Sequence, residues 1–183
     1  FGGPGSGKSS TALDVCRNFK RISAINPHIQ NVELVQEYVK GWAYERRTPQ
    51  SFDQIYIFAK QMRREDVLLR FDEVDVTVTD SPIFLSYCYG KKYEVPGYEA
   101  LLPIIDKFEE KYPSLNIFID RGNKAYVQKG RYQTEAEARE LDSFILANLE
   151  NYKGRNSFHV VKHDDIDLVM TIIMNALRPQ GIS

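Results

Sequence analysis

Hydrophobic residues recur along the chain in two patterns that alternate from one end to the other. Leu13, Cys16 and Phe19 have the spacing of one helix face, which predicts a helix over residues 10–20. Short apolar runs bounded by polar or turn-forming residues predict strands over residues 32–35, 74–79, 115–119 and 157–161. Helical spacing returns between these runs, over residues 52–70, 98–111, 135–151 and 164–177.

Two of these helices carry further local signals. Thr134 stands just before the helix over residues 135–151 and fits the N-cap position. Residues 41–51 are polar and aromatic, and we expect a mobile segment there, before the helix over residues 52–70. In that helix the apolar positions predict a buried stripe made of Ile55, Phe58, Ala59, Met62 and Val67.

Strands that alternate with helices are typical of an α/β domain. The chain is therefore predicted to form a three-layer α/β/α fold, in which helices flank a mainly parallel sheet on both faces. In such sheets ligands bind beyond the carboxyl ends of the strands. The strand ends in this sequence carry Glu37, Asp80 and the pair Asp120-Arg121, so we expect these residues to converge at one edge of the sheet.

The stretch GGPGSGKS over residues 2–9 fits the phosphate-binding loop pattern G-x-x-x-x-G-K-[ST] at every fixed position. Its backbone N–H groups and the N-terminus of the following helix suit the phosphates of ATP. Lys8 is expected to reach the β- and γ-phosphates, and the Ser9 hydroxyl to bind Mg²⁺. The predicted nucleotide-binding residues are Gly2, Gly3, Pro4, Gly5, Ser6, Gly7, Lys8, Ser9 and Ser10.

Two carboxylates after predicted strands suit phosphoryl transfer. Asp80 follows the apolar strand over residues 74–79 as a Walker B carboxylate does, so we expect it to hold Mg²⁺ together with Ser9. Glu37 could accept a proton from an acceptor hydroxyl or help to position the metal shell. The sequence leaves the division of these roles open. The alternatives are a helix N-cap for Asp80 and an ordinary surface carboxylate for Glu37.

Residues 121–134 are polar and basic and stand between a predicted strand and a predicted helix. They are expected to form a lid that places Arg121 and Arg131 against the transferring phosphate, with Lys124 and Lys129 beside them. A solvated basic loop and a surface for a DNA backbone are the alternatives. Four aromatic residues could stack on an acceptor base, although core packing is expected for at least half of them: Trp42, Tyr44, Tyr87 and Tyr89.

Composition places the chain among ordinary globular domains. Of its 183 residues, 43% are hydrophobic and 27% charged, and we expect a single domain over residues 1–183. A net charge of -1 means that a polyanion would be held by a local patch and not by an overall field. Cys16 and Cys88 are expected to be reduced thiols of a cytoplasmic protein, and no apolar run is long enough to span a membrane. Because a strand normally leads into a phosphate-binding loop, Phe1 is expected to be the last residue of a hydrophobic first strand.

The same residues resemble those of the P-loop nucleoside and nucleotide kinases. Glu37-Tyr38-Val39 and Asp80 look like the corresponding places in the ribosylnicotinamide kinase domain of bacterial NAD regulators. The stretch from Asp120-Arg121 to Gly130-Arg131-Tyr132 resembles the lid of thymidylate-kinase-like enzymes. Residues 1–9, 32–38 and 78–82 more closely resemble a bacteriophage P-loop kinase family, which includes the enzymes that phosphorylate 5-hydroxymethyluracil within phage DNA.

The resemblance implies a phosphotransferase that moves the γ-phosphate of ATP to an alcohol group of a nucleoside-like acceptor. The favoured acceptor is the 5-hydroxymethyl group of hydroxymethyluracil in phage DNA, which would place the protein in the host cytoplasm. A free nucleoside or nucleotide kinase is the alternative. Many such enzymes have an arginine directly after the aspartate that corresponds to Asp80, where this chain has Ser81. An ATPase switch that acts on a partner and a nucleotide-binding domain without catalysis are further hypotheses.

Overall fold

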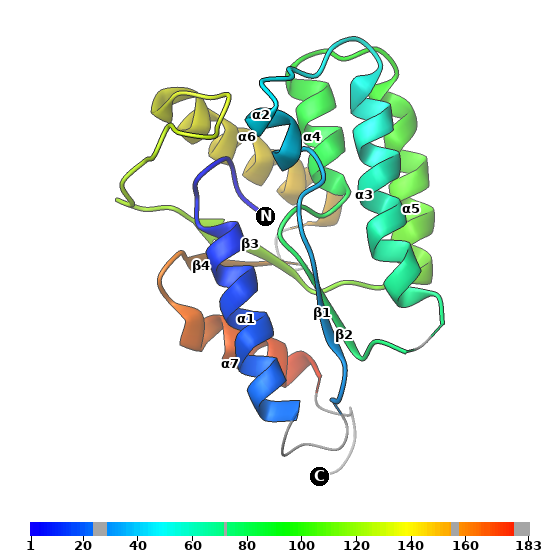
Figure 1. Cartoon of the computed structure of the whole chain (residues 1–183), viewed down its shortest axis with the longest axis vertical. Coiled ribbons are helices and arrows are strands. Elements are labelled where there is room, and N and C mark those ends of the chain that lie inside the picture. Colours follow the sequence, from blue (N-terminus) through cyan, green and yellow to red (C-terminus); the bar gives the residue numbers. More distant parts are fainter. Residues whose placement is uncertain (24–28, 72, 155–157, 178–183) are drawn as a thin grey trace.

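The computed structural model describes residues 1–23, 29–71, 73–154 and 158–177, and Figure 1 shows the arrangement of its elements. The strands are β1 (Val32–Val35), β2 (Val76–Thr79), β3 (Asn116–Asp120) and β4 (Phe158–Lys162). The helices are α1 (Lys8–Ser23), α2 (Lys40–Tyr44), α3 (Asp53–Leu69), α4 (Phe84–Lys92), the 3-10 helix η1 (Tyr98–Ala100), α5 (Leu101–Lys111), α6 (Glu135–Lys153) and α7 (Ile166–Ala176). The predicted strands and helices are all present and follow one another in the predicted order, with α2 and α4 in addition. Residue 157 of the last predicted strand lies outside the described residues.

The described strands form two parallel pairs. β1 pairs with β2, with Val32 opposite Val76, and β3 pairs with β4, with Asn116 opposite Phe158. β2 and β3 are not hydrogen-bonded to each other, and a cavity of about 370 Å³ is lined by residues of both. Parallel pairing was predicted correctly, whereas the expected single sheet is represented here by two separate two-stranded sheets.

Phe1 lies against β3 in the manner of a strand residue. Its backbone N donates to the carbonyl of Ile117 at 2.6 Å, and its own carbonyl accepts from the backbone N of Ile119 at 2.8 Å. This alternation is the hydrogen-bond pattern of a parallel ladder. The contact fixes the start of the phosphate-binding loop at the carboxyl end of β3.

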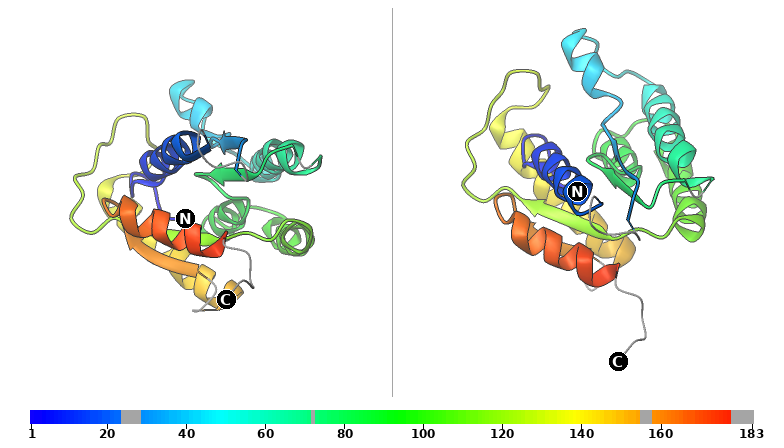
Figure 2. Two further views of the ribbon diagram at one scale, coloured as in Figure 1. Left: turned by 90° about the horizontal axis from the view of Figure 1, so that it is seen from below. Right: turned by 60° about the horizontal axis from the view of Figure 1, so that its bottom comes forward.

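Two hydrophobic cores lie on opposite faces of the strands. Adjacent residues of β3 show this, because Phe118 packs into a core with α3, α4, α5 and α6, whereas Ile117 packs towards α1 and α7. We call these the α3–α6 core and the α1–α7 core. Cys88 is buried in the first and Cys16 in the second, and both are free thiols. Figure 2 shows α1 and α7 packed side by side, so helices cover both faces as predicted.

α3 turns a different face to the core from the one its apolar pattern predicted. Ile57 and Phe58 are buried, whereas Ile55, Ala59 and Val67 are exposed. The predicted stripe was therefore wrong at these three positions. Rotating the helix in this way brings polar residues of the next turns into the interior, where they need hydrogen-bond partners.

Gln61 and Glu65 are two of the buried polar residues of α3, and they take part in a chain of hydrogen bonds. The Gln61 side-chain oxygen accepts from the backbone N of Tyr38 at 2.9 Å, and the Gln61 amide donates to Glu65 at 3.3 Å. Burial raises the pKa of Glu65 to about 8, so this carboxyl group is mainly protonated at neutral pH. These hydrogen bonds connect α3 to the turn that follows β1.

Three further differences concern helix boundaries. The segment over residues 41–51, expected to be a mobile segment, includes most of the short helix α2. Residues 84–92 form α4, where the apolar pattern predicted no helix, and residues 98–111 divide into η1 and α5. Thr134 caps α6 as predicted, and it forms a capping box with Glu137. In the part of the chain that the structure describes, no helix has the length and apolar character that crossing a membrane requires.

Candidate functional site

The phosphate-binding loop runs from Phe1, which pairs with β3, to the start of α1. Gly5 and Gly7 have φ angles of 75° and 118°, which side-chain-bearing residues rarely adopt. A β-carbon at Gly5 would also lie 3.1 Å from ring carbons of Tyr126. The loop is therefore curved by glycines, and α1 begins directly after it at Lys8. This is the loop-to-helix arrangement that the sequence motif requires.

Lys8 folds back over the loop. Its ammonium group donates to the carbonyl of Gly3 at 2.8 Å. Desolvation by the surrounding protein lowers the pKa of Lys8, and the charge of Arg121 lowers it further, while Glu37 and Asp80 raise it. Because the carbonyl of Gly3 satisfies only one of the three ammonium donors, Lys8 keeps donors for an anion at the loop.

Asp80 joins three segments at the carboxyl end of β2. It is 6% exposed, and one carboxylate oxygen accepts from the Ser9 hydroxyl at 2.5 Å. The other oxygen accepts from the backbone N of Glu37 at 2.8 Å. An aliphatic hydroxyl beside an aspartate is the hard oxygen donor set that Mg²⁺ takes when phosphates and water complete its shell. Ser9 and Asp80, the two predicted metal ligands, therefore lie together and fit the ion.

Glu37 is brought beside these groups by the turn after β1. Burial raises the pKa of the Glu37 carboxyl and the charge of Asp80 raises it further, whereas Lys8 and Lys40 lower it. A half-buried carboxylate with a raised pKa is suited to taking a proton from a hydroxyl at neutral pH. The surface-carboxylate alternative does not describe this position.

The predicted lid over residues 121–134 folds onto the loop. The Arg131 guanidinium carbon lies 3.3 Å from the position that a β-carbon would occupy at Gly5, and the Lys124 ammonium 3.1 Å from the equivalent position at Gly7. The Arg131 guanidinium also lies over the ring of Tyr126, 5.3 Å from its centroid. Two of the basic lid residues are thus placed at the phosphate-binding loop.

The lid also touches the segment on the other side of the loop. The Tyr132 hydroxyl donates to the carbonyl of Arg47 at 2.5 Å, and Gly130 packs against the ring of Tyr44. The lid therefore bridges from the end of β3 to the region of α2. An arrangement of this kind encloses the bound phosphates and limits the access of water.

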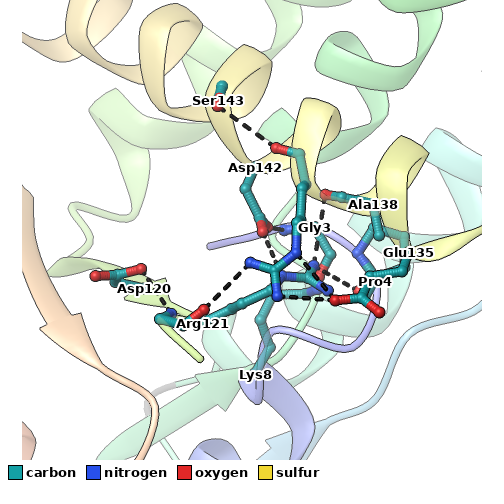
Figure 3. Close-up of polar contacts among 11 residues, drawn as sticks. Gly3, Pro4, Lys8, Asp120, Arg121, Glu135, Ala138, Asp142 and Ser143 are labelled. Carbon is teal, nitrogen blue, oxygen red and sulfur yellow. Dashed lines mark hydrogen bonds and ion pairs between the residues drawn. The ribbon is translucent and has the colours of Figure 1, made fainter. Parts of the chain in front are cut away.

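Arg121 is placed differently from the other lid residues. Its side chain is 2% exposed and lies between the phosphate-binding loop and α6, where it pairs with Asp142 (Figure 3). It also donates to the carbonyl of Pro4 at 2.7 Å. In this position Arg121 holds the loop against α6, and its Nη1 atom is buried without a hydrogen-bond partner among the described residues. Asp120, its neighbour, accepts from the backbone N of Gly122 at 2.9 Å.

The four aromatic residues predicted as candidates for stacking on a base occupy different environments. Trp42 is buried and stacks on Tyr56, and Tyr87 packs against Phe84. Tyr89 is half-buried, stacks with Tyr93 and contacts the α3–α6 core. Tyr44 is 71% exposed beside the lid. Core packing accordingly accounts for at least half of them, as expected, and Tyr44 stays mostly exposed, although its ring also contacts Gly130.

Asp142 and Tyr126 belong to the site but carry no motif. Asp142 lies in the interior of α6, and its carboxylate accepts from the backbone N of Gly3 at 2.6 Å across 139 positions of the chain. The Tyr126 ring lies on Gly5. Neither contact has a local sequence signal. Ser10, predicted to bind nucleotide, is exposed in the first turn of α1.

Comparison with known proteins gives one match. The family model described as an AAA domain matches residues 1–167, which include the phosphate-binding loop, Glu37, Asp80 and the lid. No curated protein and no solved structure matches the chain. The match covers most of the chain and agrees with a phosphate-binding loop of the kind that binds a nucleoside triphosphate.

Proposed function

The chain belongs to the AAA domain family, and we propose that within this family it is an ATP-dependent phosphotransferase that acts on an alcohol group. Domains with this phosphate-binding loop bind nucleotide, usually ATP with Mg²⁺. The proposal adds the direction of transfer, from the γ-phosphate to a hydroxyl acceptor and not to water.

The observation that carries the proposal is the bridge that the lid makes over the phosphate-binding loop. Tyr126 and Arg131 lie on Gly5, and Tyr132 is hydrogen-bonded to the carbonyl of Arg47 on the far side. A kinase has to keep water from the γ-phosphate while an acceptor is in place, and a lid that closes on both sides serves this purpose. A hydrolase has no such requirement.

The roles of the residues follow from their positions. Lys8 would bind the β- and γ-phosphates, and Ser9 and Asp80 would hold Mg²⁺. When bound, Mg²⁺ would supply positive charge that neutralises the negative charge developing on the phosphates. Glu37 would accept the proton of the attacking hydroxyl, and Arg131 would stabilise the transferring phosphate from the lid. Asp80 is hydrogen-bonded to Ser9 and to the backbone N of Glu37, and Arg131 lies beside Gly5.

For the acceptor, we propose the 5-hydroxymethyl group of hydroxymethyluracil in DNA. Exposed rings gather where the lid meets α2, since Tyr44 packs on Gly130, Tyr132 bonds to Arg47, and Tyr93 accepts from Gln133. Aromatic rings and guanidinium groups of this kind stack on unpaired bases. Free nucleosides are the alternative acceptor, because they would offer the same base to the same rings.

A second candidate is an ATPase switch, since the match to an AAA domain is compatible with nucleotide hydrolysis as well as with transfer to an acceptor. The two candidates differ in where the phosphate goes. A kinase leaves it on the acceptor, whereas a switch releases inorganic phosphate at a rate that a partner controls.

The test uses ATP labelled in the γ-phosphate, Mg²⁺ and three acceptors: DNA containing hydroxymethyluracil, the same DNA with thymine, and free 5-hydroxymethyl-2′-deoxyuridine. Label is expected on the first DNA alone. Label only on the free nucleoside would replace the acceptor but keep the kinase. Release of labelled inorganic phosphate with no labelled acceptor would overturn the kinase and support the switch.

A further inference from the structure

Asp142 is the point at which α6 holds the phosphate-binding loop. One carboxylate oxygen accepts from the backbone N of Gly3 at 2.6 Å, and the other accepts from Nε of Arg121 (Figure 3). The Arg121 Nη2 atom in turn donates to the carbonyls of Pro4, at 2.7 Å, and Ala138, at 3.4 Å. The N–H of Gly3 and the carbonyl of Pro4, neighbours in the loop, are thus both fixed by one ion pair.

The loop approaches α6 so closely that this contact leaves little freedom. A β-carbon at Gly3 would lie 2.6 Å from the Asp142 carboxylate and 2.8 Å from the carbonyl of Ala138. Arg121 is 2% exposed and the Asp142 side chain 17% exposed, so water does not compete effectively for these bonds. A buried pair with a shared hydrogen-bond network holds its partners in one geometry more firmly than an exposed pair does.

The two residues also connect the loop to both ends of the lid. Arg121 is the first residue of the lid, and α6, which carries Asp142, begins at the Thr134 cap where the lid ends. The two side chains that hold the loop therefore belong to the segments that begin and follow the lid. The charges of both residues also reach Lys8, where Arg121 and Asp142 act in opposite directions.

We propose that Asp142 and Arg121 are positioning residues for nucleotide binding. The pair turns the N–H of Gly3 towards α6 and away from the phosphates, and so fixes the curvature with which the following N–H groups meet them. The inference rests on the loop's nucleotide binding and is independent of the acceptor, so its test contains no acceptor and a failure of the proposed kinase reaction would leave it unaffected.

The test measures ADP affinity by calorimetry for Asp142→Asn, Asp142→Ala and Arg121→Lys, together with the melting temperature of each variant. Asp142→Asn keeps an oxygen that can accept from Gly3 and loses the ion pair, whereas Asp142→Ala loses both. We expect the dissociation constant for ADP to rise about 10-fold or more in Asp142→Ala and Arg121→Lys, and less in Asp142→Asn. Glu140→Gln, which removes the exposed pair with Lys92 from the same helix, should bind ADP like the unmodified protein.

A purely structural pair would behave differently. It would lower the melting temperature and leave the ADP affinity of the folded protein unchanged, and this result would overturn the proposal. If the variants do not fold, amide hydrogen exchange of the unmodified protein decides the question. The Gly3 amide is expected to be protected both with and without ADP, and fast exchange in the ADP complex would contradict the assignment.

Discussion

The Ser9 hydroxyl donates a 2.5 Å hydrogen bond to the Asp80 carboxylate, although the two residues are 71 positions apart. This contact joins the first turn of α1 to the carboxyl end of β2. The other Asp80 oxygen is used by the backbone N of Glu37. The Asp80 carboxylate therefore holds Ser9, at the end of the phosphate-binding loop, and Glu37, the candidate base, on either side of it.

Asp80→Asn tests this role. The amide of the variant can still accept from the backbone of Glu37, but it lacks the negative charge that Mg²⁺ requires. We expect turnover to fall roughly 100-fold and the Mg²⁺ concentration for half-maximal activity to rise. A magnesium titration of activity measures both effects. Asp14→Asn, an exposed carboxylate change on α1, is the matched control, and an unaltered magnesium requirement in Asp80→Asn would contradict the assignment.

Lys8→Met separates what the lysine contributes to activity from the folding stability that burying its ammonium group costs. Turnover and ATP affinity should fall by about 100-fold or more, because the phosphates lose their mobile positive charge. The melting temperature should stay the same or rise, since the folded state lowers the pKa of Lys8 by desolvation. Lys20→Met on the same helix provides the comparison, and a large drop in melting temperature in Lys8→Met alone would argue against this account.

The sign of the pH effect at Lys8 follows from the same shift. A lysine whose pKa is lower in the folded state holds fewer protons there than in the unfolded chain between the two pKa values. Stability attributable to Lys8 therefore increases as the pH rises towards the unfolded value of 10.5. The difference in unfolding free energy between Lys8→Met and the unmodified protein should narrow in that range, as denaturant titrations at several pH values would show.

Tyr132→Phe loosens the lid without changing its charge. The hydroxyl that donates to the carbonyl of Arg47 is lost, so the lid should open more often and admit water. We expect a several-fold increase in ATP hydrolysis without acceptor and a lower ratio of acceptor phosphorylation to ADP formed. Tyr112→Phe removes a tyrosine hydrogen bond to Asp66, away from the lid, and should leave that ratio unchanged.

Glu65 gives the fold a second pH dependence, opposite in sign to that of Lys8. Its pKa is raised to about 8 in the folded state from an ordinary value of 4.5, so the folded protein holds an extra proton between these values. Stability should therefore decrease as the pH rises from about 5 to 8, by at most about 1.4 kcal/mol per pH unit. Glu65→Gln keeps an oxygen for Gln61 and should remove this slope. Unfolding curves that keep the same slope in the variant would show that another group is responsible.

Local signals in the sequence predicted most of the elements and part of the site. The loop motif, the Thr134 cap and the strand over residues 32–35 depend on neighbouring residues, and the structure has them at those positions. α4 was missed because Phe84, Leu85, Ser86 and Cys88 are buried together, which leaves no single apolar face for a periodic pattern.

The remaining features depend on contacts between distant segments. Burial of Gln61 and Glu65 follows from a hydrogen bond to the turn after β1, and an apolar pattern within α3 cannot show it. Arg121 was predicted to act from the lid because it follows a strand. Asp142, 21 positions later, instead binds it between the loop and α6. Polar partners of this kind are set by packing and not by local propensity.

The two cysteines lie one in each core, Cys16 between α1 and α7 and Cys88 on α4 within the α3–α6 core. Burial also raises the pKa of Cys88 to about 12, so neither thiol should react with alkylating reagents while its core stays closed. The rate at which each thiol is alkylated therefore reports how often the core on its face of the molecule opens. Mass spectrometry of alkylated protein can show whether ATP slows the opening of both faces equally or protects mainly the α1 side, where the loop ends.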